Sequence, residues 1–128
     1  MRGLITTDAI RGAAAILGPV AIRTPLVRAP WLEELVGAEI RLKCENLQRI
    51  GSFKFPGAYV AHARLPEEAR HRGVVAYSAG NHAQAVALAA RLFGTSAVVV
   101  MSTNVVPVEV EERRAPGCGS RLSGDEWP

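Results

Sequence analysis

The chain has 128 residues, 48% of them hydrophobic, and a formal net charge of +3 at pH 7, which together predict a folded domain rather than a disordered chain. Its basic residues are scattered and aromatic residues make up only 5% of the sequence, so we expect no nucleic-acid partner. There is no apolar run near the roughly 18 residues of a membrane span, no signal-peptide pattern and no cysteine cluster, so we expect a cytoplasmic protein without a membrane partner or a metal site.

The first half of the chain alternates helical and extended segments. Thr6 or Thr7 is a suitable cap for the first helix, and the Gly18-Pro19 pair would end it. The residue before a proline is kept out of the helical region, so Thr24 predicts extended backbone. In chain order we expect a helix over 8–17, an extended segment over 23–29, a short helix over 31–36 that ends at Gly37, a strand over 38–45, a loop over 46–52 and a helix over about 55–64.

The second half contains the clearest unit, which is a strand over 73–77, a tight loop over 78–81, a helix over 82–93 and a second strand over 96–101. A unit of this length predicts two parallel strands joined by a right-handed crossover, which is α/β architecture. The helix is apolar on nearly all sides, so we expect it to lie against a sheet or between layers. Beyond this unit we expect a second helix over 106–117 and no strand in the tail over 118–128.

The loop Ser78-Ala79-Gly80-Asn81-His82 follows the carboxyl end of a predicted parallel strand and leads into a helix. Free backbone N–H groups and the positive end of the helix dipole meet there, with side-chain donors from Ser78 and Asn81. This geometry suits a carboxylate or a phosphate, at the edge where α/β sheets bind ligands. The alternative is that Ser78 and Asn81 only cap the helix, which is the more frequent role of such residues.

Lys54 lies between Phe53 and Phe55, near the expected start of a helix. Only Lys43 and Lys54 are lysines among the 15 basic residues. A lysine beside apolar rings is expected to be partly desolvated, which raises the fraction of neutral amine and suits covalent chemistry with an aldehyde cofactor. The alternative is an ordinary lysine that holds its ammonium in water, and for a lysine taken at random this is the more frequent case.

The other titratable residues have plainer expectations. His62 and His71 have the sequence context of surface residues. A histidine such as His82 on an alanine-rich helix is more often structural than catalytic. Glu45 is of greater interest, because it ends a predicted strand close to the loop that carries Lys54.

Two motifs, in order along the chain, favour the functional alternatives for Lys54 and for the loop from Ser78 to His82 over the structural ones. The segment from Lys43 to Lys54 reads K-x-E-x-x-Q-x-x-G-S-F-K, it is preceded by Thr24-Pro25-Leu26, and S-A-G-N-H lies downstream. Together these motifs closely resemble the fold-type II pyridoxal-phosphate enzymes of the threonine/serine dehydratase (ammonia-lyase) group, which includes serine racemase. The resemblance implies the N-terminal portion of a tryptophan synthase β-like fold, with an open parallel sheet and flanking helices.

The resemblance also implies roles for individual residues. Lys54 matches the lysine that holds pyridoxal phosphate and later moves the α-proton of the substrate. Phe53 matches the aromatic residue beside the cofactor ring, and Asn81 matches the residue that hydrogen-bonds the 3′-oxygen of the cofactor. The loop that receives the substrate carboxylate is matched by Ser78, Ala79, Gly80, Asn81 and His82.

The reaction that the resemblance implies is deamination of L-threonine or L-serine to 2-oxobutanoate or pyruvate and ammonia, as in isoleucine biosynthesis. Family members are usually homo-oligomers. Relatives that racemise serine carry a serine where this chain has Ala79, and alanine has no proton to give on the second face of the cofactor. Deamination needs proton transfer on one face only, so the sequence favours a dehydratase and keeps serine racemase activity as the alternative.

The chain departs from the family pattern in two respects. Pro56 stands where the family has arginine. Family members are also much longer, and the resemblance places their glycine-rich phosphate-binding loop and the residue that meets the pyridine nitrogen beyond the match, so we expect a truncated chain with impaired activity. On the family plan, residues 1–66 are the N-terminal piece of the large domain, residues 67–128 are most of the small α/β domain, and the rest of the large domain is absent.

Three functional interpretations therefore stay open on the sequence. The first is a truncated dehydratase-family polypeptide whose ancestral function is deamination of threonine or serine. The second is a non-catalytic module that binds an amino acid through the carboxylate loop, and the third is an inactive remnant.

Overall fold

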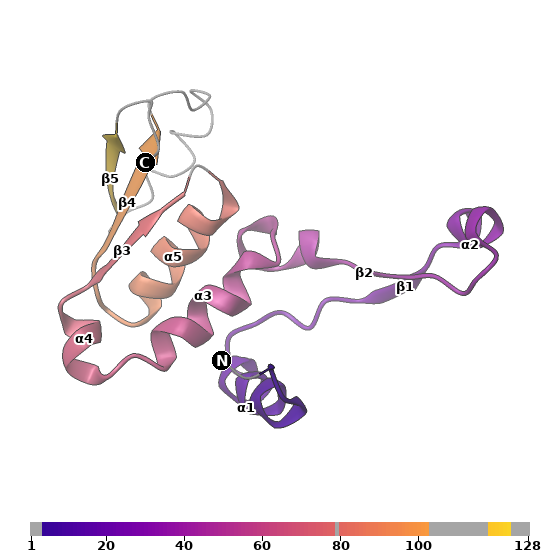
Figure 1. Ribbon diagram of the computed structural model, residues 1–128, viewed down its shortest axis with the longest axis horizontal. Coiled ribbons are helices and arrows are strands. Elements are labelled where there is room, and N and C mark those ends of the chain that lie inside the picture. The colour runs from indigo at the N-terminus through magenta and orange to yellow at the C-terminus, as the bar shows by residue number, and fades with distance from the viewer. Residues whose placement is uncertain (1–3, 79, 103–117, 124–128) are drawn as a thin grey trace.

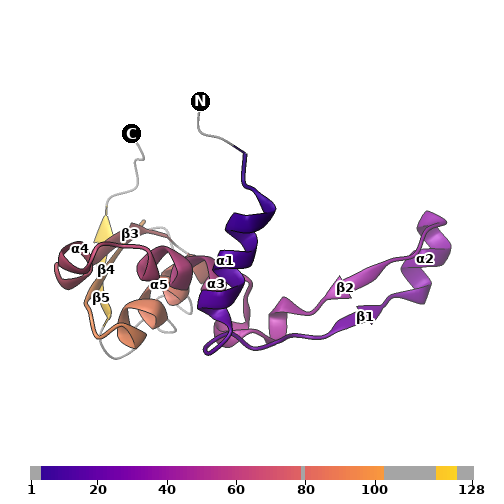
Figure 2. The same ribbon diagram turned by 90° about the horizontal axis from the view of Figure 1, so that it is seen from below.

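The computed structural model describes residues 4–78, 80–102 and 118–123 of the chain. These residues form a layered α/β body and a long arm that projects from it (Figures 1 and 2). The arm is residues 26–43 and ends in a short helix. Helix α1, Thr7–Leu17, lies against helix α3, Lys54–Ala63, on the side where the arm meets the body.

The N-terminal helix begins where its sequence predicts. The hydroxyl of Thr6 accepts a hydrogen bond from the N–H of Ala9 at 3.2 Å, which satisfies one of the free donors of the first turn. Of the two threonines expected as caps, Thr6 is therefore the one that acts, and Thr7 is the first residue of α1.

The arm is a two-stranded ribbon with a helix at its tip. Strand β1, Leu26–Arg28, pairs antiparallel with β2, Arg41–Lys43, and helix α2, Pro30–Val36, connects them. Gly37 follows α2 in the left-handed conformation with a φ of 72°, and its N–H donates to the carbonyl of Glu33 at 2.8 Å. The predicted stop at Gly37 is confirmed, because glycine adopts this conformation without steric cost.

A three-stranded parallel sheet is the base of the body. Strands β3 (Val74–Tyr77), β4 (Ala97–Ser102) and β5 (Cys118–Ser123) lie in the order β3-β4-β5. Helix α5, Asn81–Leu92, connects β3 to β4, which pair in parallel. The predicted βαβ unit and the α/β class are confirmed.

Strand β5 shows that the expectation of a strandless tail is wrong. The residues from Cys118 to Ser123 pair in parallel with β4, from the register Ala97↔Cys118 to Ser102↔Ser123. The neighbouring strand supplies the backbone hydrogen bonds, so weak β-propensity in the residues themselves does not prevent pairing. The helix expected over 106–117 lies outside the described residues.

Helix α5 lies between the sheet and α3 (Figure 1). The buried residues of α5 are alanines apart from Val86, whereas α3 contributes the large, fully buried side chain of Phe55. One buried cluster draws on α3, α5 and β4, and its members are Phe55, Ala58, Ala85, Val86, Ala89, Ala90 and Ala97. This core continues across residue 66, where the sequence places a domain boundary; the division into domains itself stays a prediction.

Helices α3 and α5 run in the same direction. At their carboxyl ends, Tyr59 and His62 of α3 both meet the ring of Phe93, directly after α5, at centroid distances of 4.8 and 6.2 Å. At the other end, the turn Arg49–Gly51 that precedes α3 contacts α5. Both helices therefore begin at the same end of the pair, the end nearer the arm (Figure 1).

His62 is buried, which shows that its assignment to the surface is wrong. Its side chain is 4% exposed, its ring lies parallel to that of Phe93, and its Nδ1 is 2.8 Å from the carbonyl oxygen of Ala58. The packing of α3 on α5 buries this face of α3, and that packing is not visible in the local sequence. His71, in the short helix α4 (Glu67–His71), is exposed as expected.

Candidate functional site

The common end of α3 and α5 brings together the two motifs that the sequence singled out. Lys54 is the first residue of α3 and Asn81 is the first residue of α5. Because α3 and α5 pack on each other and run in the same direction, both N-termini lie at the same end of the helix pair. Residues 27 positions apart in the sequence are thus placed at one end of one helix pair.

Lys54 and Phe53 are exposed at this end, and Phe55 is not. The Lys54 ammonium lies over the ring of Phe53, with Nζ 4.9 Å from the ring centroid, whereas Phe55 is fully buried in the core. The expectation that two rings desolvate Lys54 is therefore wrong. Residues two apart on a helix point in nearly opposite directions, so Phe53 and Phe55 cannot cover the same side chain.

The start of α3 is fixed by a buried serine. The hydroxyl of Ser52 accepts a hydrogen bond from the N–H of Lys54 at 3.1 Å, and Ser52 is only 4% exposed. A hydroxyl bonded two residues onward forms a local turn that competes with other backbone conformations. Ser52 therefore sets where the helix begins and where Lys54 leaves the loop.

The loop before α5 leaves the helix start without a side-chain cap among the described residues. Gly80 occupies the cap position, and the hydroxyl of Ser78 accepts a hydrogen bond from the N–H of Gly80 at 3.2 Å. Asn81 and His82 are exposed. No side chain of the described residues caps α5, but the N–H of Ala83 already donates to the carbonyl of Gly80 at 2.9 Å. The N–H groups of Asn81 and His82 therefore keep the anion-binding character that a cap would have used. Ala79 lies outside the described residues.

Ser78 is anchored to the sheet. Its N–H donates to the carbonyl of Val100 in β4 at 3.0 Å, directly beyond the β3–β4 ladder. The loop is therefore held at the carboxyl edge of two parallel strands, as the sequence predicted for this class of sheet.

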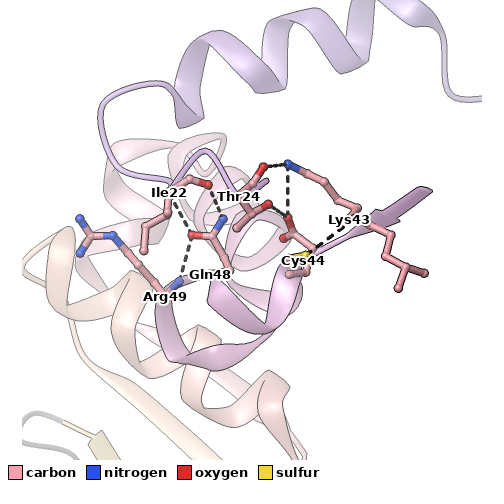
Figure 3. A network of polar contacts seen from close by, with 8 residues as sticks. Ile22, Thr24, Lys43, Cys44, Gln48 and Arg49 are labelled. Carbon is pink, nitrogen blue, oxygen red and sulfur yellow. Dashed lines mark hydrogen bonds and ion pairs between the residues drawn. The ribbon is translucent and has the colours of Figure 1, made fainter. Parts of the chain in front are cut away.

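A polar network ties the loop before Lys54 to the segment that enters the arm (Figure 3). The side chain of Gln48 accepts a hydrogen bond from the N–H of Ile22 at 3.0 Å and donates one to the carbonyl of the same residue at 2.9 Å. Beside it, the hydroxyl of Thr24 donates to Glu45 at 2.6 Å and the ammonium of Lys43 donates to the carbonyl of Thr24 at 2.6 Å.

This network explains the residue types of K-x-E-x-x-Q. Thr24 and Gln48 are 4% and 5% exposed, and polar groups at such depth need hydrogen-bond partners. Glu45 takes part in the network through Thr24 and Lys43. The sequence identified the motif by resemblance but gave no signal for these contacts, because Gln48 and Ile22 are 26 residues apart.

Between Gln48 and Lys54 the backbone passes through two consecutive left-handed residues. Ile50 has a φ of 63° and Gly51 a φ of 65°. Of the described residues that are not glycine, Ile50 alone has a positive φ. A β-branched residue in this conformation is a strained outlier, so the surroundings must hold it there.

No group of three or more histidine, cysteine, aspartate or glutamate side chains lies close enough to hold a metal ion within residues 4–78, 80–102 and 118–123. Within the same ranges, no helix is both long and apolar enough to cross a membrane.

The chain is similar to known proteins over most of its length. The family model described as "Pyridoxal-phosphate dependent enzyme" matches residues 18–127. The L-threonine ammonia-lyase of Thermotoga maritima is 48% identical over 122 residues, which are 95% of this chain and 30% of that protein. The L-threo-3-hydroxyaspartate ammonia-lyase of a Pseudomonas species is 47% identical over 110 residues, which are 86% of this chain and 34% of that protein.

Among solved structures, maize serine racemase superimposes with a TM-score of 0.85 and 38% identity, over 93% of this chain and 36% of that one. The chain thus spans about a third of the length of each of these proteins. The family match covers most of the chain and the superposition confirms the expected fold-type II architecture. The chain belongs to the pyridoxal-phosphate dependent enzymes.

Proposed function

We propose that this chain contributes the lysine and the carboxylate loop to the site of an ammonia-lyase that deaminates L-threonine or L-serine to 2-oxobutanoate or pyruvate and ammonia. One observation carries the proposal: the exposed amine of Lys54 and the uncapped start of α5 lie at the same end of a helix pair. Similarity to proteins named L-threonine ammonia-lyase and L-threo-3-hydroxyaspartate ammonia-lyase supports this reaction class. Because the match spans about a third of their length, we propose that the 128 residues alone have impaired activity.

The residues at this end suit the cofactor of the family. The Lys54 ammonium has no hydrogen bond or ion pair with the described residues, so its amine is available to an aldehyde. The ring of Phe53, 63% exposed, offers an apolar face beside it. When bound, pyridoxal phosphate supplies an electron sink that favours loss of the substrate α-proton.

The chain's own side chains then have distinct tasks. Lys54 holds the cofactor through its amine and afterwards moves the proton at the substrate Cα. The N–H groups at the start of α5, with Ser78, Ala79, Gly80, Asn81 and His82, bind the substrate carboxylate, and the positive end of the helix dipole favours this anion. Asn81 orients the cofactor by a hydrogen bond, and Phe53 excludes water from one side of the ring.

Serine racemase activity is the second candidate, and similarity to the maize enzyme supports it. Alanine at position 79 opposes it, because a racemase needs a proton donor on the second face of the cofactor. Formation of d-serine from l-serine, lost in Lys54→Ala, would favour racemisation over deamination. A role in isoleucine biosynthesis, a homo-oligomeric state and a cytoplasmic location belong to the same proposal and rest on family resemblance.

Lys43 is an internal control for a direct test of the proposal. Its ammonium already donates to the carbonyl of Thr24 at 2.6 Å and lies 3.9 Å from the carboxylate of Glu45, whereas Lys54 contacts a ring. The experiment is to mix the purified chain with pyridoxal phosphate, reduce with borohydride, and map the adducts by peptide mass spectrometry. We expect adduct on Lys54 well above that on Lys43 and on the N-terminal amine, and its loss in Lys54→Arg, since arginine cannot act as an amine nucleophile.

The outcomes separate the three interpretations. Selective labelling of Lys54 together with 2-oxobutanoate release from threonine supports the ammonia-lyase. Amino-acid binding without selective labelling supports a non-catalytic module. Evenly distributed labelling and a broad, uncooperative melt would support an inactive remnant and contradict the proposed function.

A further inference from the structure

We propose that Gln48 is a positioning residue whose side chain holds the left-handed turn at Ile50 and Gly51 and thereby directs Lys54 toward the start of α5. This inference rests on the proposed function, in which Lys54 receives the cofactor. Gln48 touches neither cofactor nor substrate in this role; it acts through the backbone that leads to the lysine.

Gln48 is held by hydrogen bonds to both polar atoms of its side chain. Its side-chain oxygen accepts hydrogen bonds from the N–H groups of Ile22 and Arg49, both at 3.0 Å, and its amide nitrogen donates to the carbonyl of Ile22 at 2.9 Å. Figure 3 shows the amide of Gln48 facing the backbone of Ile22. One side chain thus satisfies both backbone groups of a distant residue, as a neighbouring strand would.

Gln48 also takes part in the turn through its own backbone. The carbonyl of Gln48 accepts a hydrogen bond from the N–H of Gly51 at 2.8 Å, so Gln48 closes the turn with its backbone while its side chain fixes the start of the turn. The guanidinium of Arg49 donates to the carbonyl of Val20, and Ile50 packs against the buried cluster of α3 and α5. Arg49 and Ile50 are therefore anchored on different parts of the fold.

The turn leads directly into Ser52, whose hydroxyl binds the N–H of Lys54. The left-handed conformation of Ile50 costs about 1–2 kcal/mol for a residue with a Cβ, so the turn relaxes unless it is held. Ser52 follows Gly51 directly and bonds the N–H of Lys54. A change of backbone at Ile50 and Gly51 therefore alters the entry into α3 and the direction in which Lys54 leaves it.

The test uses two variants of the 128-residue chain and one matched control. Gln48→Leu replaces the amide by an apolar side chain of similar size. Gly51→Ala changes the turn without disturbing the network, since a Cβ there meets its nearest atom, the carbonyl oxygen of Asn46, at 3.8 Å. Gly37→Ala is the control, because Gly37 also has a positive φ with open space around it but lies at the tip of the arm.

Two readouts are measured on each chain. Backbone chemical shifts and HN–Hα couplings report whether Ile50 and residue 51 keep a left-handed conformation. The ratio of borohydride-trapped pyridoxal phosphate on Lys54 to that on Lys43 reports the direction of the lysine. We expect Gln48→Leu to lose the left-handed signature of Ile50 and to lower the labelling ratio about tenfold, which corresponds to about 1.4 kcal/mol. Gly51→Ala should lower the ratio by a smaller factor, and Gly37→Ala should leave it unchanged.

Several results would overturn the inference. An unchanged ratio in both variants, with Ile50 still left-handed in Gln48→Leu, means that Gln48 does not hold the turn. An equal fall in all three variants means that general destabilisation is the cause. If the ratio in the wild-type chain is near one, the proposed function is contradicted instead. The role of Gln48 is then decided by the chemical shifts of Ile50, Gly51 and Lys54. If these shifts are unchanged in Gln48→Leu, Gln48 does not hold the turn.

Discussion

The imidazole ring of His62 lies parallel to the ring of Phe93, with 6.2 Å between their centroids and 7° between their planes. His62 Nδ1 is within hydrogen-bond distance of the Ala58 carbonyl, but Nε2 is buried without a hydrogen-bond partner among the described residues. An unpaired buried nitrogen costs about 1–3 kcal/mol.

Replacing this histidine by an apolar residue should therefore stabilise the chain. The Ala58 carbonyl keeps its helical hydrogen bond in His62→Leu, so we expect a gain of about 1 kcal/mol in the free energy of unfolding. Urea denaturation followed by circular dichroism measures this. His71→Leu, on an exposed site, should change stability by no more than about 0.5 kcal/mol. A loss of stability in His62→Leu would show that Nε2 has a stabilising contact.

The order of the arm should depend on pH through Glu33. The guanidinium of Arg28 holds the pKa of the Glu33 carboxyl below its usual range, with a further contribution from the N–H of Ile40. A carboxyl whose pKa is lower in the folded state stabilises that state above its unfolded pKa, and this contribution is lost as pH falls through the folded value. We expect the amide of Ile40 to lose protection from hydrogen exchange below about pH 4, after correction for the intrinsic rate. In Glu33→Gln this pH dependence should be absent, and its persistence would assign the effect to another carboxyl.

Two glycines with positive φ should respond differently to alanine. A Cβ at Gly73 would lie 2.3 Å from the hydroxyl oxygen of Ser96 and 2.9 Å from its carbonyl oxygen, whereas a Cβ at Gly94 meets nothing within 4 Å. Gly94→Ala should cost only the left-handed conformational penalty of about 1–2 kcal/mol, because Gly94 has a φ of 65°. Gly73→Ala should cost about 3 kcal/mol or more, because the backbone of Ser96 must move. Equal losses in thermal or urea unfolding would contradict the close approach of these two segments.

Pro56 should be nearly neutral for the stability of α3. It lies in the first turn, where the N–H groups have no acceptor within the helix, and α3 runs without interruption from Lys54 to Ala63. We expect Pro56→Ala to change the free energy of unfolding by less than about 1 kcal/mol. Ala61→Pro, on an exposed site in the same helix, should cost about 3 kcal/mol. A large effect of Pro56→Ala would mean that this departure from the family pattern shapes the lysine end of the helix.

The sequence predicted those features whose cause is local. The cap at Thr6, the stop at Gly37 and the strand–helix–strand unit follow from residue types within a few positions of one another. The failures have distant causes. Strand β5 depends on β4, and the burial of His62 depends on α5, which lies beyond residue 80.

In the candidate site, too, features with local causes were predictable and contacts between distant residues were not. The resemblance identified Lys54 and the loop from Ser78 to His82, and the helix geometry places Lys54 and Asn81 at one end. The contact between Gln48 and Ile22 was not predictable, because no periodicity or motif joins residues 26 positions apart. The expectation that two rings cover Lys54 was wrong, because Phe55 points away from Phe53 on the helix and is buried in the core.

The buried alanines of α5 limit which substitutions the core near the candidate site can accept. The buried cluster shared by α3 and α5 consists of small alanine side chains together with Phe55 and Val86, and such a close-packed core has no room for larger side chains. Ala85 and Ala89 are both fully buried in the cluster that joins α3 and α5, so enlarging either one would force the packed elements to shift. On the proposed function, such a shift changes the distance between Lys54 and the loop before α5. On the proposed function, buried residues that do not line the site can therefore alter which substrates fit it.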